Sequence, residues 1–597
     1  MAGIYGILGG TEPGELAAMR ERLQHRGTAV REWSPRADMH LGLRSSDGES
    51  AMDAAVENEV LFDGFLDNAE ALLDLLGVPA RHGKRPHDAS IVRGVFEKFG
   101  ADGFGYVAGH FALVLWDKAR DRLVLARDRY GARPLNITNV HDRCLFASEY
   151  KALLAIPSVP ARPNADAIQY LQCTKFVKPD VTFLRDVHPV PSGQWVPVSL
   201  RDLRPSRGTA YWSVQVDVGD TSEAELATRL RQSILDATER QTAAYDPIGV
   251  SLSGGLDSAI TLAALKHVAP AKTVHTFSAG FGARDREIVD AQEMADHFGT
   301  LHHQLFLQPE ELPELLPPIV WYLEDPAGRE ETAFLYITSR EAAKHVSMLM
   351  GGYGADLLFA GMARHRVIST ALRFPLLRRP LEDFLTYTQT GLPPVSLAGK
   401  VLTALYYRGK RYPVPAVIGA ENWPSRIELR PSSEQPLTSY LLDILTKEPG
   451  GSKTERLHSA FGIAYNAPCM DPSIITWASR IPDHMRIRGR TQKYILRQAF
   501  RGLLPDQVLK TKKTLQKLQH DQELSRVLES LAARYLSRAD VLARGLVDPA
   551  YVARAVRRNP QHAYSSERAY RIWSLVMTEL WCRTFLDARG RPPELNR

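Results

Sequence analysis

Cysteine is scarce in this sequence, and no two cysteines lie close together. The four cysteines among the 597 residues are Cys144, Cys173, Cys469 and Cys582, and no C-x-x-C pair occurs. This spacing argues against a zinc site built on cysteine and against a disulfide framework. We expect each thiol to be a small buried side chain.

Long apolar runs and a strong excess of one charge are also missing. No stretch approaches the ~20 uncharged apolar residues that cross a membrane, and the start of the chain is too short and too little basic for a signal peptide. The net charge is only +6, and 44% hydrophobic with 24% charged residues is ordinary globular composition. We therefore expect a cytoplasmic protein of two or more domains that binds neither nucleic acid nor membrane.

A buried strand, a tight glycine-rich turn and a helix start are predicted in residues 247–258, which read P-I-G-V-S-L-S-G-G-L-D-S. The glycines let the backbone approach an anion, and the unpaired N–H groups of the first helical turn face it. Asp257 can hold the Mg²⁺ that accompanies a nucleoside triphosphate. The plain alternative is a turn that binds nothing. The candidate ATP-binding residues here are Ser251, Ser253, Gly254, Gly255, Leu256, Asp257 and Ser258.

Predicted strands and helices alternate around this loop. The predicted elements are strands at 250–252, 273–280 and 302–307 and helices at 259–267 and 286–298. Such alternation favours a parallel sheet with helices on both faces, in which ligands bind beyond the carboxyl ends of the strands. Phe277 and Ser278 lie on one such strand, whose backbone edge is the expected place for the adenine.

A second glycine-rich turn follows a predicted buried strand at 346–350. It carries Gly352, Tyr353 and Asp356. Two aspartates at neighbouring strand ends are what a Mg²⁺ that bridges phosphate oxygens requires. The predicted metal ligands are therefore Asp257 and Asp356.

The glycine-rich loop resembles the pyrophosphate loop of the ATP pyrophosphatases, and other segments resemble the asparagine synthetase superfamily. The N-terminal glutaminase domain of that superfamily is similar to M-A-G-I-Y-G-I-L at 1–8, H-R-G at 25–27, F-D-G at 62–64 and A-R-D-R-Y-G-A-R-P-L at 126–135. Its substrate turn and lysine loop resemble A-P-C-M-D at 467–471 and R-G-R-T-Q-K-Y-I-L-R at 488–497. The resemblance implies adenylation of a carboxylate with release of pyrophosphate, and it places Lys493 over the alpha phosphate.

Two positions depart from the glutaminase pattern. The superfamily uses a cysteine directly after the initiator methionine, but this sequence has Ala2, whose methyl group cannot attack an amide. The asparagine–glycine oxyanion pair is matched by Asp63 and Gly64, and a carboxylate there would repel the developing oxyanion. Arg44 and Asp88 match glutamine-binding positions. The two changes together favour a naturally inactive glutaminase domain with a structural role over an engineered cysteine-to-alanine change.

The synthetase part shows features of related cyclases. In asparagine synthetase the position of Tyr353 is usually acidic, whereas a tyrosine there resembles beta-lactam synthetase, in which it helps to deprotonate the attacking amine. The alternative for Tyr353 is simple packing beside glycines. Ala464 stands where both enzymes carry a glutamate, so the pair is incomplete unless Glu455 or another carboxylate substitutes. Lasso-peptide cyclases have a comparable Ala-Pro turn and also carry an inactive glutaminase domain.

The predicted fold is α/β. Residues 1–205 are expected to form an N-terminal αββα sandwich of the Ntn-hydrolase type. Residues 206–597 are expected to form a parallel-sheet ATP-pyrophosphatase domain with a helical C-terminal part. The basic and aromatic stretch at 363–452 is predicted to be an insertion, either a solvated helical face or a surface for an acidic or peptide substrate.

The predicted function is an ATP- and Mg²⁺-dependent ligase that joins a small-molecule or peptide carboxylate to an amine from a source other than glutamine, as in macrolactam biosynthesis of the lasso type. The predicted catalytic residues are Lys493 and Tyr353. The alternatives are an asparagine synthetase in engineered or ammonia-dependent form, a beta-lactam synthetase-like cyclase, and a non-catalytic nucleotide-binding scaffold. A homodimer and partner biosynthetic proteins both stay open.

Overall fold

The computed structural model describes most of the chain between residues 2 and 593. The parts of that range not described are 47–51, 55–57, 79–84, 175–176, 179, 214–215, 217–221, 327–330, 391, 408–416, 423–434, 448–449, 511–521 and 558–565. Part of the predicted insertion at 363–452 therefore lies outside the described residues.

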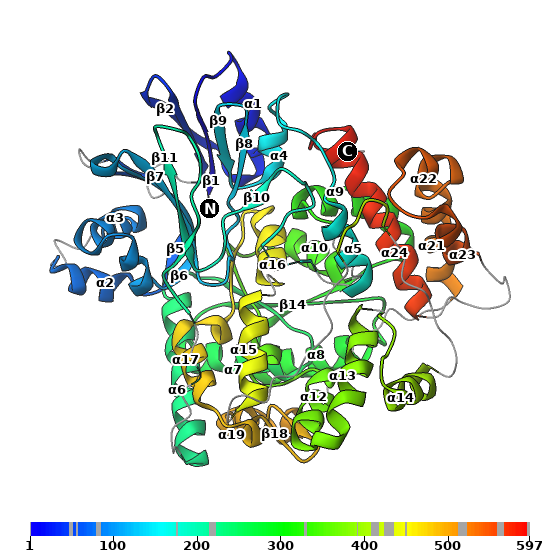
Figure 1. Ribbon diagram of the computed structural model, residues 1–597. Coiled ribbons are helices and arrows are strands. Elements are labelled where there is room, and N and C mark those ends of the chain that lie inside the picture. Colours follow the sequence, from blue (N-terminus) through cyan, green and yellow to red (C-terminus); the bar gives the residue numbers. More distant parts are fainter. Residues whose placement is uncertain are drawn as a thin grey trace.

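The N-terminal part of the chain forms two antiparallel six-stranded sheets that pack face to face (Figure 1). The first has the order β10-β8-β9-β1-β3-β2 and the second the order β12-β11-β7-β6-β5-β4. In β1 (Ala2–Leu8), Ile4 and Leu8 enter the core between the sheets, whereas Tyr5 and Ile7 enter the core on the opposite face, as a strand period of two requires. The other strands are β2 (Ala29–Arg36), β3 (Met39–Ser45), β4 (Met52–Ala54), β5 (Asn58–Leu66), β6 (Gly109–Asp117), β7 (Arg122–Arg127), β8 (Asn136–Val140), β9 (Arg143–Ala147), β10 (His188–Pro189), β11 (Gln194–Ser199) and β12 (Thr209–Ala210).

Helices cover the outer faces of both sheets. α1 (Glu15–Arg22) and α4 (Tyr150–Leu154) share a core with the first sheet, and α2 (Ala69–Leu76) and α3 (Asp88–Phe99) share one with the second. The layers are therefore helix, sheet, sheet, helix, which confirms the predicted αββα sandwich. α5 (Ala165–Thr174) follows and leads toward the second part of the chain.

The second part is built on a parallel five-stranded sheet with the order β15-β14-β13-β16-β17. These strands are β13 (Ile248–Ser251), β14 (Val274–Gly280), β15 (Leu301–Phe306), β16 (Met348–Met350) and β17 (Ala464–Asn466). The strand order reverses between β13 and β16, so right-handed crossovers place α7 (Leu256–Val268) and α8 (Arg286–Phe298) on the face opposite to α9 (Leu312–Leu323) and α10 (Glu331–Ala342). The predicted parallel sheet with helices on both faces is confirmed.

Two predicted boundaries differ from the structure for a local reason. α7 begins at Leu256 rather than at residue 259, because Gly255 is already the residue that precedes the helix. β16 begins at Met348 rather than at residue 346, because His345 and Val346 still bond to the end of the preceding helical turn. The earlier start of α7 makes the first glycine-rich turn shorter than the sequence pattern indicated.

The remaining elements are mostly helical. α6 (Glu223–Thr242) packs on α7. The later elements are α11 (Ala355–Leu358), α12 (Ala363–Arg373), α13 (Pro375–Thr390), α14 (Leu397–Tyr407), α15 (Pro436–Lys447), α16 (Gly450–Ser459), α17 (Pro472–Arg480), α18 (Asp483–Arg486), β18 (Ile487–Arg488), β19 (Thr491–Gln492), α19 (Tyr494–Ala499), α20 (Asp506–Lys510), α21 (Gln522–Tyr535), α22 (Arg538–Arg544), α23 (Pro549–Val556) and α24 (Ser566–Trp581).

One hydrophobic core is shared by the two parts of the chain. Tyr5 and Ile7 of β1 belong to the same buried cluster as Trp581 of α24 and Ile319 of α9. Figure 1 shows α24 close to α9 and α5, near the helical side of the sandwich. All four cysteines are buried and unpaired, as predicted. Among the described residues, no helix has the length and apolarity needed to cross a membrane.

Candidate active site

The predicted phosphate loop joins β13 to α7 and has the expected form. Gly254 has a φ of 62°, and a Cβ there would lie 2.5 Å from the Cβ of Asp290, so only glycine fits. The Ser258 hydroxyl donates to the Gly255 carbonyl and accepts from the Ser253 N–H at 3.2 Å. The first turn of α7 has no side-chain cap. Its N–H groups can therefore donate to an anion.

The second glycine-rich turn lies directly against this loop. A Cβ on Gly352 would come within 2.6 Å of the Asp257 Cβ. The Thr261 hydroxyl also donates to the Gly351 carbonyl at 3.3 Å. This close approach brings Asp257 and Asp356 to one place, although about a hundred residues separate them in the sequence.

Lys493 lies between the two aspartates. Its Nζ is 2.6 Å from both carboxylate oxygens of Asp257 and 2.5 Å from Oδ1 of Asp356. Burial alone would lower the Lys493 pKa, but the two carboxylates outweigh it and raise the pKa above its usual value. Gly361 makes room for this contact, since a Cβ there would collide with Asp356 and with the Lys493 side chain. The ammonium group is therefore fully charged at neutral pH.

This geometry fits the predicted Mg²⁺. Two carboxylates converge on one cationic position, and in this structure the Lys493 ammonium fills the role of the cation. Hard oxygen ligands of this kind are those that Mg²⁺ prefers, together with phosphate oxygens. Asp257 and Asp356 would hold the ion. The ion would displace the Lys493 ammonium from between the two carboxylates, and Lys493 would then turn toward the phosphates.

Phe277 and Ser278 lie next to the loop on β14, but their side chains are engaged elsewhere. Ser251 of β13 pairs with Phe277 of β14. The Phe277 ring is fully buried and stacks on His303, and the Ser278 hydroxyl lies 3.0 Å from the His302 Nε2. Only the backbone of these two residues is left to contact an adenine.

Tyr353 lines a small cavity that encloses about 20 Å³, room for about one water molecule. Glu455 of α16 lines the same cavity, so one carboxylate that could stand in for the glutamate absent at position 464 lies in the same wall as Tyr353. Burial raises the Glu455 pKa, and Arg133 partly opposes this shift. The cavity also has walls from the N-terminal sandwich. Its other lining residues are His110, Tyr130, Ala132, Leu445, Tyr465, Ala467 and Met470.

The loop that follows β7 carries Arg133 into this wall. Oxygens of Asp128 accept from the backbone N–H groups of Tyr130, Ala132 and Arg133 at 3.0–3.1 Å. The buried Arg127 guanidinium donates to three main-chain carbonyls around the same loop, including that of Arg133 at 2.7 Å. The loop is thereby rigid, and it holds the Arg133 Nη1 2.7 Å from Glu455 Oε1.

Two of the predicted vestigial glutaminase residues, Ala2 and Asp63, are in contact with each other and with a buried arginine. The buried Ala2 N–H donates to Asp63 Oδ1 at 2.8 Å. Asp63 Oδ2 accepts from Arg26 Nη1 at 3.1 Å, and the same Arg26 nitrogen donates to the Ala2 carbonyl at 3.2 Å. The Asp63 position is thus satisfied by a cation that sequence reasoning did not single out.

The other three predicted residues of this site have structural contacts. Gly64 has a φ of 148°, and a Cβ there would lie 1.9 Å from the His110 carbonyl oxygen, so the strand pairing requires glycine. Arg44 donates to the Gly27 carbonyl at 2.6 Å. Asp88 accepts from the Leu66 N–H at 2.9 Å and pairs with Arg85.

A chain of buried charges continues from this site to the synthetase part. Arg26 Nε lies 2.6 Å from Glu149 Oε1, and Lys151 Nζ lies 2.6 Å from Glu149 Oε2. The fully buried Glu324, which follows α9, accepts from the N–H groups of Tyr150 and Lys151 at 2.9 and 2.7 Å. Arg26, Glu149, Lys151 and Glu324 are each at most 1% exposed. The charges fill the boundary between the two parts of the chain.

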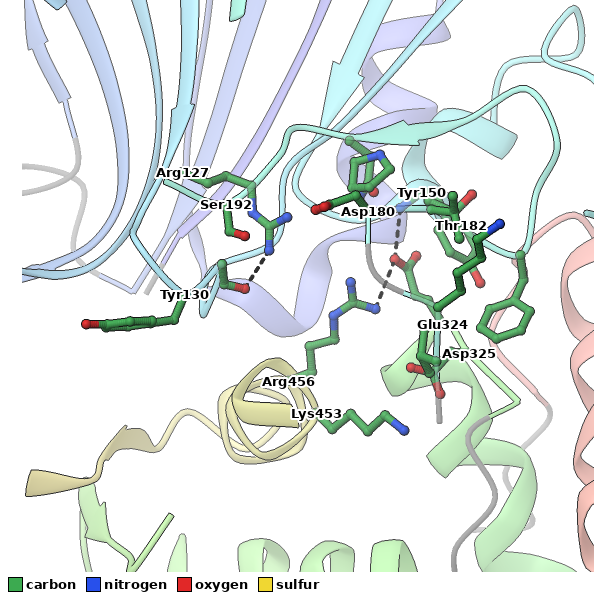
Figure 2. Close-up of a pocket in the computed structure, with 17 residues that line it drawn as sticks. Arg127, Tyr130, Tyr150, Asp180, Thr182, Ser192, Glu324, Asp325, Lys453 and Arg456 are labelled. Atoms are coloured by element: carbon green, nitrogen blue, oxygen red, sulfur yellow. Dashed lines mark hydrogen bonds and ion pairs between the residues drawn. The ribbon is translucent and has the colours of Figure 1, made fainter. Parts of the chain in front are cut away.

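A larger cavity, of about 80 Å³, lies beside these charges. Figure 2 shows Lys453 and Arg456 extending from α16 toward Glu324 and Asp325, with Arg127 on the opposite wall. Arg456 Nη1 is 3.7 Å from Glu324 Oε2. None of the predicted ATP-binding residues lines this cavity, and it carries charges of both signs.

Sequence reasoning missed the residues that connect the two parts, namely Arg26, Arg133, Glu149, Lys151 and Glu324. Arg26 and Arg133 lie within segments quoted for the resemblance, but nothing in the local pattern marks an arginine as buried. A buried ion pair can be predicted from a sequence only when both of its partners are known. Glu149 and Lys151 are near neighbours that pair with each other, but Arg26, Arg133 and Glu324 each pair with a residue far away in the sequence.

Comparisons with known proteins match both parts of the chain. A family profile described as glutamine amidotransferase domain matches residues 1–212, and one described as asparagine synthase matches residues 229–583. A relative named asparagine synthetase [glutamine-hydrolyzing] 1, from Bacillus subtilis, is 26% identical over 566 residues, which cover 90% of this chain and 87% of the relative. Asparagine synthetase B [glutamine-hydrolyzing] from Escherichia coli is 22% identical and covers 70% of this chain and 63% of its own.

Among solved structures, one described as the allosteric regulatory enzyme of purine biosynthesis matches with a TM-score of 0.28 and 13% identity. The match covers 51% of this chain and 81% of that chain. At that TM-score the likeness carries no argument about this protein.

Proposed function

The chain belongs to the asparagine synthetase family and is an ATP-dependent carbon–nitrogen ligase, and we propose that it joins a carboxylate to an amine that is not released from glutamine. The carboxylate would first be activated as its adenylate, and the amine would then displace AMP. The division between an N-terminal amidotransferase-like domain and a synthetase domain is proposed near residue 205, and a cytoplasmic location stays a prediction.

The observation that carries the proposal is the pairing of Ala2, Asp63 and Arg26. A glutaminase of this type needs a nucleophile at the second residue and a neutral donor for the oxyanion. Ala2 has no nucleophile, and Asp63 is a carboxylate held by Arg26 at 3.1 Å. The ion pair gives Asp63 a structural partner, which supports a natural rather than an engineered loss of the activity.

The first half-reaction would take place at the two glycine-rich turns. An oxygen of the substrate carboxylate attacks the alpha phosphorus of ATP, and pyrophosphate leaves with the electrons of the bond that breaks. The N–H groups at the start of α7 would hold the pyrophosphate, and Lys493 would stabilise the negative charge on the alpha phosphate. Bound Mg²⁺ supplies charge neutralisation between phosphate oxygens.

The second half-reaction would take place beside Tyr353 and Glu455. The amine nitrogen attacks the acyl carbon, AMP leaves, and the amine proton passes to a base. Tyr353 and Glu455 line one cavity, and burial raises the Glu455 pKa, which brings a carboxyl group nearer to the range in which it can accept a proton at neutral pH. Glu455 would in this way replace the glutamate that is absent at Ala464.

We propose a peptide as the substrate class, with its own amine and side-chain carboxylate joined in a macrolactam of the lasso type. The supporting features are the inactive N-terminal site, the Ala-Pro turn at 467–468 and the helical stretch around α12 to α14, which offers a surface for a peptide. A beta-lactam synthetase-like cyclisation is the second candidate, because Tyr353 favours it. An ammonia-dependent asparagine synthetase and a non-catalytic scaffold are the remaining alternatives.

The test is pyrophosphate release together with product analysis. Purified protein, ATP and Mg²⁺ would be incubated with peptides that carry a free amine and an aspartate or glutamate, and with aspartate plus ammonia. We expect pyrophosphate and a peptide product lighter by one water, without nitrogen from isotope-labelled glutamine. Labelled nitrogen in the product would overturn the proposal. Asparagine formation from aspartate and ammonia would favour the synthetase alternative, and the absence of pyrophosphate with every substrate would favour the scaffold.

A further inference from the structure

Three histidines gather at one edge of the parallel sheet. His275 belongs to β14, His303 to the edge strand β15, and His345 to the turn between α10 and β16. One ring nitrogen from each lies within 4.8 Å of the other two. The His275 Nδ1 and the His303 Nε2 are 2.9 Å apart. Within the described part of the chain, this is the one group of three or more histidine, cysteine, aspartate or glutamate side chains whose ligand atoms lie close enough together to hold a metal ion.

The cluster is separate from the ATP site. His275 is the second residue of β14, and His345 precedes β16, so both lie toward the amino ends of parallel strands. The phosphate loop follows the carboxyl end of β13. Neighbouring His302 points to the other face of the sheet, where it bonds to Thr276 and Ser278. The cluster is therefore not explained by the proposed reaction.

The rings are held in place by packing. His303 stacks on Phe277 with ring centroids 4.8 Å apart, and on His345 with centroids 4.3 Å apart. Glu341 Oε1 lies 3.2 Å from His345 Nε2. A carboxylate beside a metal-binding histidine orients the ring or adds an oxygen ligand. All three histidines are half-buried, and β15 is at the edge of the sheet, so solvent can reach the group.

The ligand chemistry suits one class of ion. Neutral imidazole nitrogens bind Zn²⁺ and similar first-row ions, with Zn–N distances of about 2.0–2.1 Å. Three nitrogens around one ion at that distance lie at most about 4.2 Å apart, so the three rings, whose planes are now tilted by only 15–35° to one another, would have to turn out of this stack to point their nitrogens at one ion. Burial and the neighbouring histidines lower the pKa of His275 and of His303.

We propose that His275, His303 and His345 form a Zn²⁺ site, with water or Glu341 as the fourth ligand. The ion would join two strands of the sheet to the turn that precedes β16. The Zn²⁺ ion would therefore stabilise the fold of the synthetase domain, and this role does not depend on whether the proposed ligase function is correct. A site with three histidines would also bind Co²⁺, whose absorption spectrum reports its coordination.

The test uses full-length protein without a histidine tag, freed of metal with a chelator. Co²⁺ titration followed by visible absorption, and competition by Zn²⁺, should give one ion per chain. Saturating Zn²⁺ should raise the melting temperature by a few degrees, because it binds the folded state alone. His303→Ala should weaken Zn²⁺ affinity at least ~10-fold, the loss seen when even an outer partner of a ligand is removed. His303→Phe should weaken Zn²⁺ affinity to the same extent while keeping an aromatic ring in the stack. A loss of affinity in this variant is therefore due to the missing ligand and not to a folding defect.

The matched control is His297→Ala. His297 is exposed on α8 and lies outside the cluster, so this variant should bind Zn²⁺ as the parent protein does. The proposal is overturned if the metal-free protein takes up no stoichiometric ion, or if His303→Phe binds Zn²⁺ with unchanged affinity and the same Co²⁺ spectrum. Pyrophosphate formation plays no part in this readout.

Discussion

Arg133 of the N-terminal sandwich and Glu455 of α16 form an ion pair 2.7 Å long in which both residues are 1% exposed. Through Arg133, the vestigial Asp63 is also connected to this pair at 3.9 Å. A residue of the N-terminal domain therefore pairs with a carboxylate in the wall of the cavity that Tyr353 also lines. The N-terminal domain thus contributes a charged residue to the wall of the cavity that we propose for the second half-reaction.

We expect Glu455→Gln to slow amide formation by ~100-fold or more, the usual contribution of a general base, and to leave adenylate formation nearly unchanged. The physical reason is that glutamine cannot accept the amine proton. Single-turnover measurements that follow adenylate and amide separately would check this. The double variant Arg133→Met/Glu455→Gln removes both charges and should recover any stability lost in the single variant without recovering amide formation. Amide formation at the parent rate in Glu455→Gln would leave Tyr353 or the substrate as the base.

Asp257→Asn and Asp356→Asn should each reduce pyrophosphate formation by at least ~100-fold while the fold is kept. Both carboxylates converge on one cation and stand at the surface of the loops rather than in the core. The measurement is pyrophosphate release at saturating ATP, with circular dichroism as the check on folding. Asp296→Asn, at an exposed position of α8, is the control. Near-full turnover in either active-site variant would contradict the metal assignment.

Lys493→Met and Tyr353→Phe should affect different half-reactions. Removing the Lys493 charge should depress adenylation, and hence amide formation, by ~100-fold or more, since it takes away a few kcal/mol of charge stabilisation. Tyr353→Phe should leave adenylation largely unchanged and slow product formation, most clearly at a pH where the amine is mostly protonated. Rapid-quench kinetics with the true substrate would separate the two steps. Equal slowing of both steps in Tyr353→Phe would reduce this tyrosine to a packing role.

Ala2→Cys alone should restore very little glutaminase activity. The new thiol would lie beside a carboxylate that is ion-paired with Arg26, and the loss of one oxyanion donor costs ~100-fold or more. Glutamate release from glutamine is the measurement, and a brisk rate in the single variant would identify the chain as an asparagine synthetase with a changed nucleophile. Asp63→Asn should instead lower stability, by less than the ~3–5 kcal/mol lost when a buried charge is left unpaired, because it removes one of the two carboxylates that pair with the buried Arg26 and leaves Glu149 as the other. Urea denaturation would measure that loss.

The sequence was sufficient to predict the architecture of both parts of the chain and the position of the two glycine-rich loops. Gly254 and Gly352 mark local turns, and the alternation of strands and helices predicts a parallel sheet. The turns and the sheet can therefore both be predicted from short stretches of sequence. Lys493 was expected over the alpha phosphate, whereas the structure finds it between Asp257 and Asp356; that position depends on a contact between distant loops. Its role toward ATP stays a prediction.

The buried charges could not be predicted, because burial of a charge depends on a partner that local pattern does not reveal. Glu149 and Lys151 lie in the segment F-A-S-E-Y-K-A-L-L, which has the composition of an ordinary helix start. Only the packing of α4 against the turn after α9 shows that both are enclosed. The three-histidine cluster was missed for the same reason, since its members come from three separate elements.

The core shared by β1 and α24 has a consequence for the order in which the protein can be completed on the ribosome. β1 ends at Leu8 and α24 begins at Ser566, so more than 550 residues are synthesised between them. At ~5–20 residues per second this takes roughly half a minute to two minutes. During that interval the buried cluster to which Tyr5 and Ile7 belong lacks the residues that α24 contributes to it. The nascent chain thus exposes part of this apolar cluster until translation is nearly finished, the kind of transient surface that is prone to aggregation.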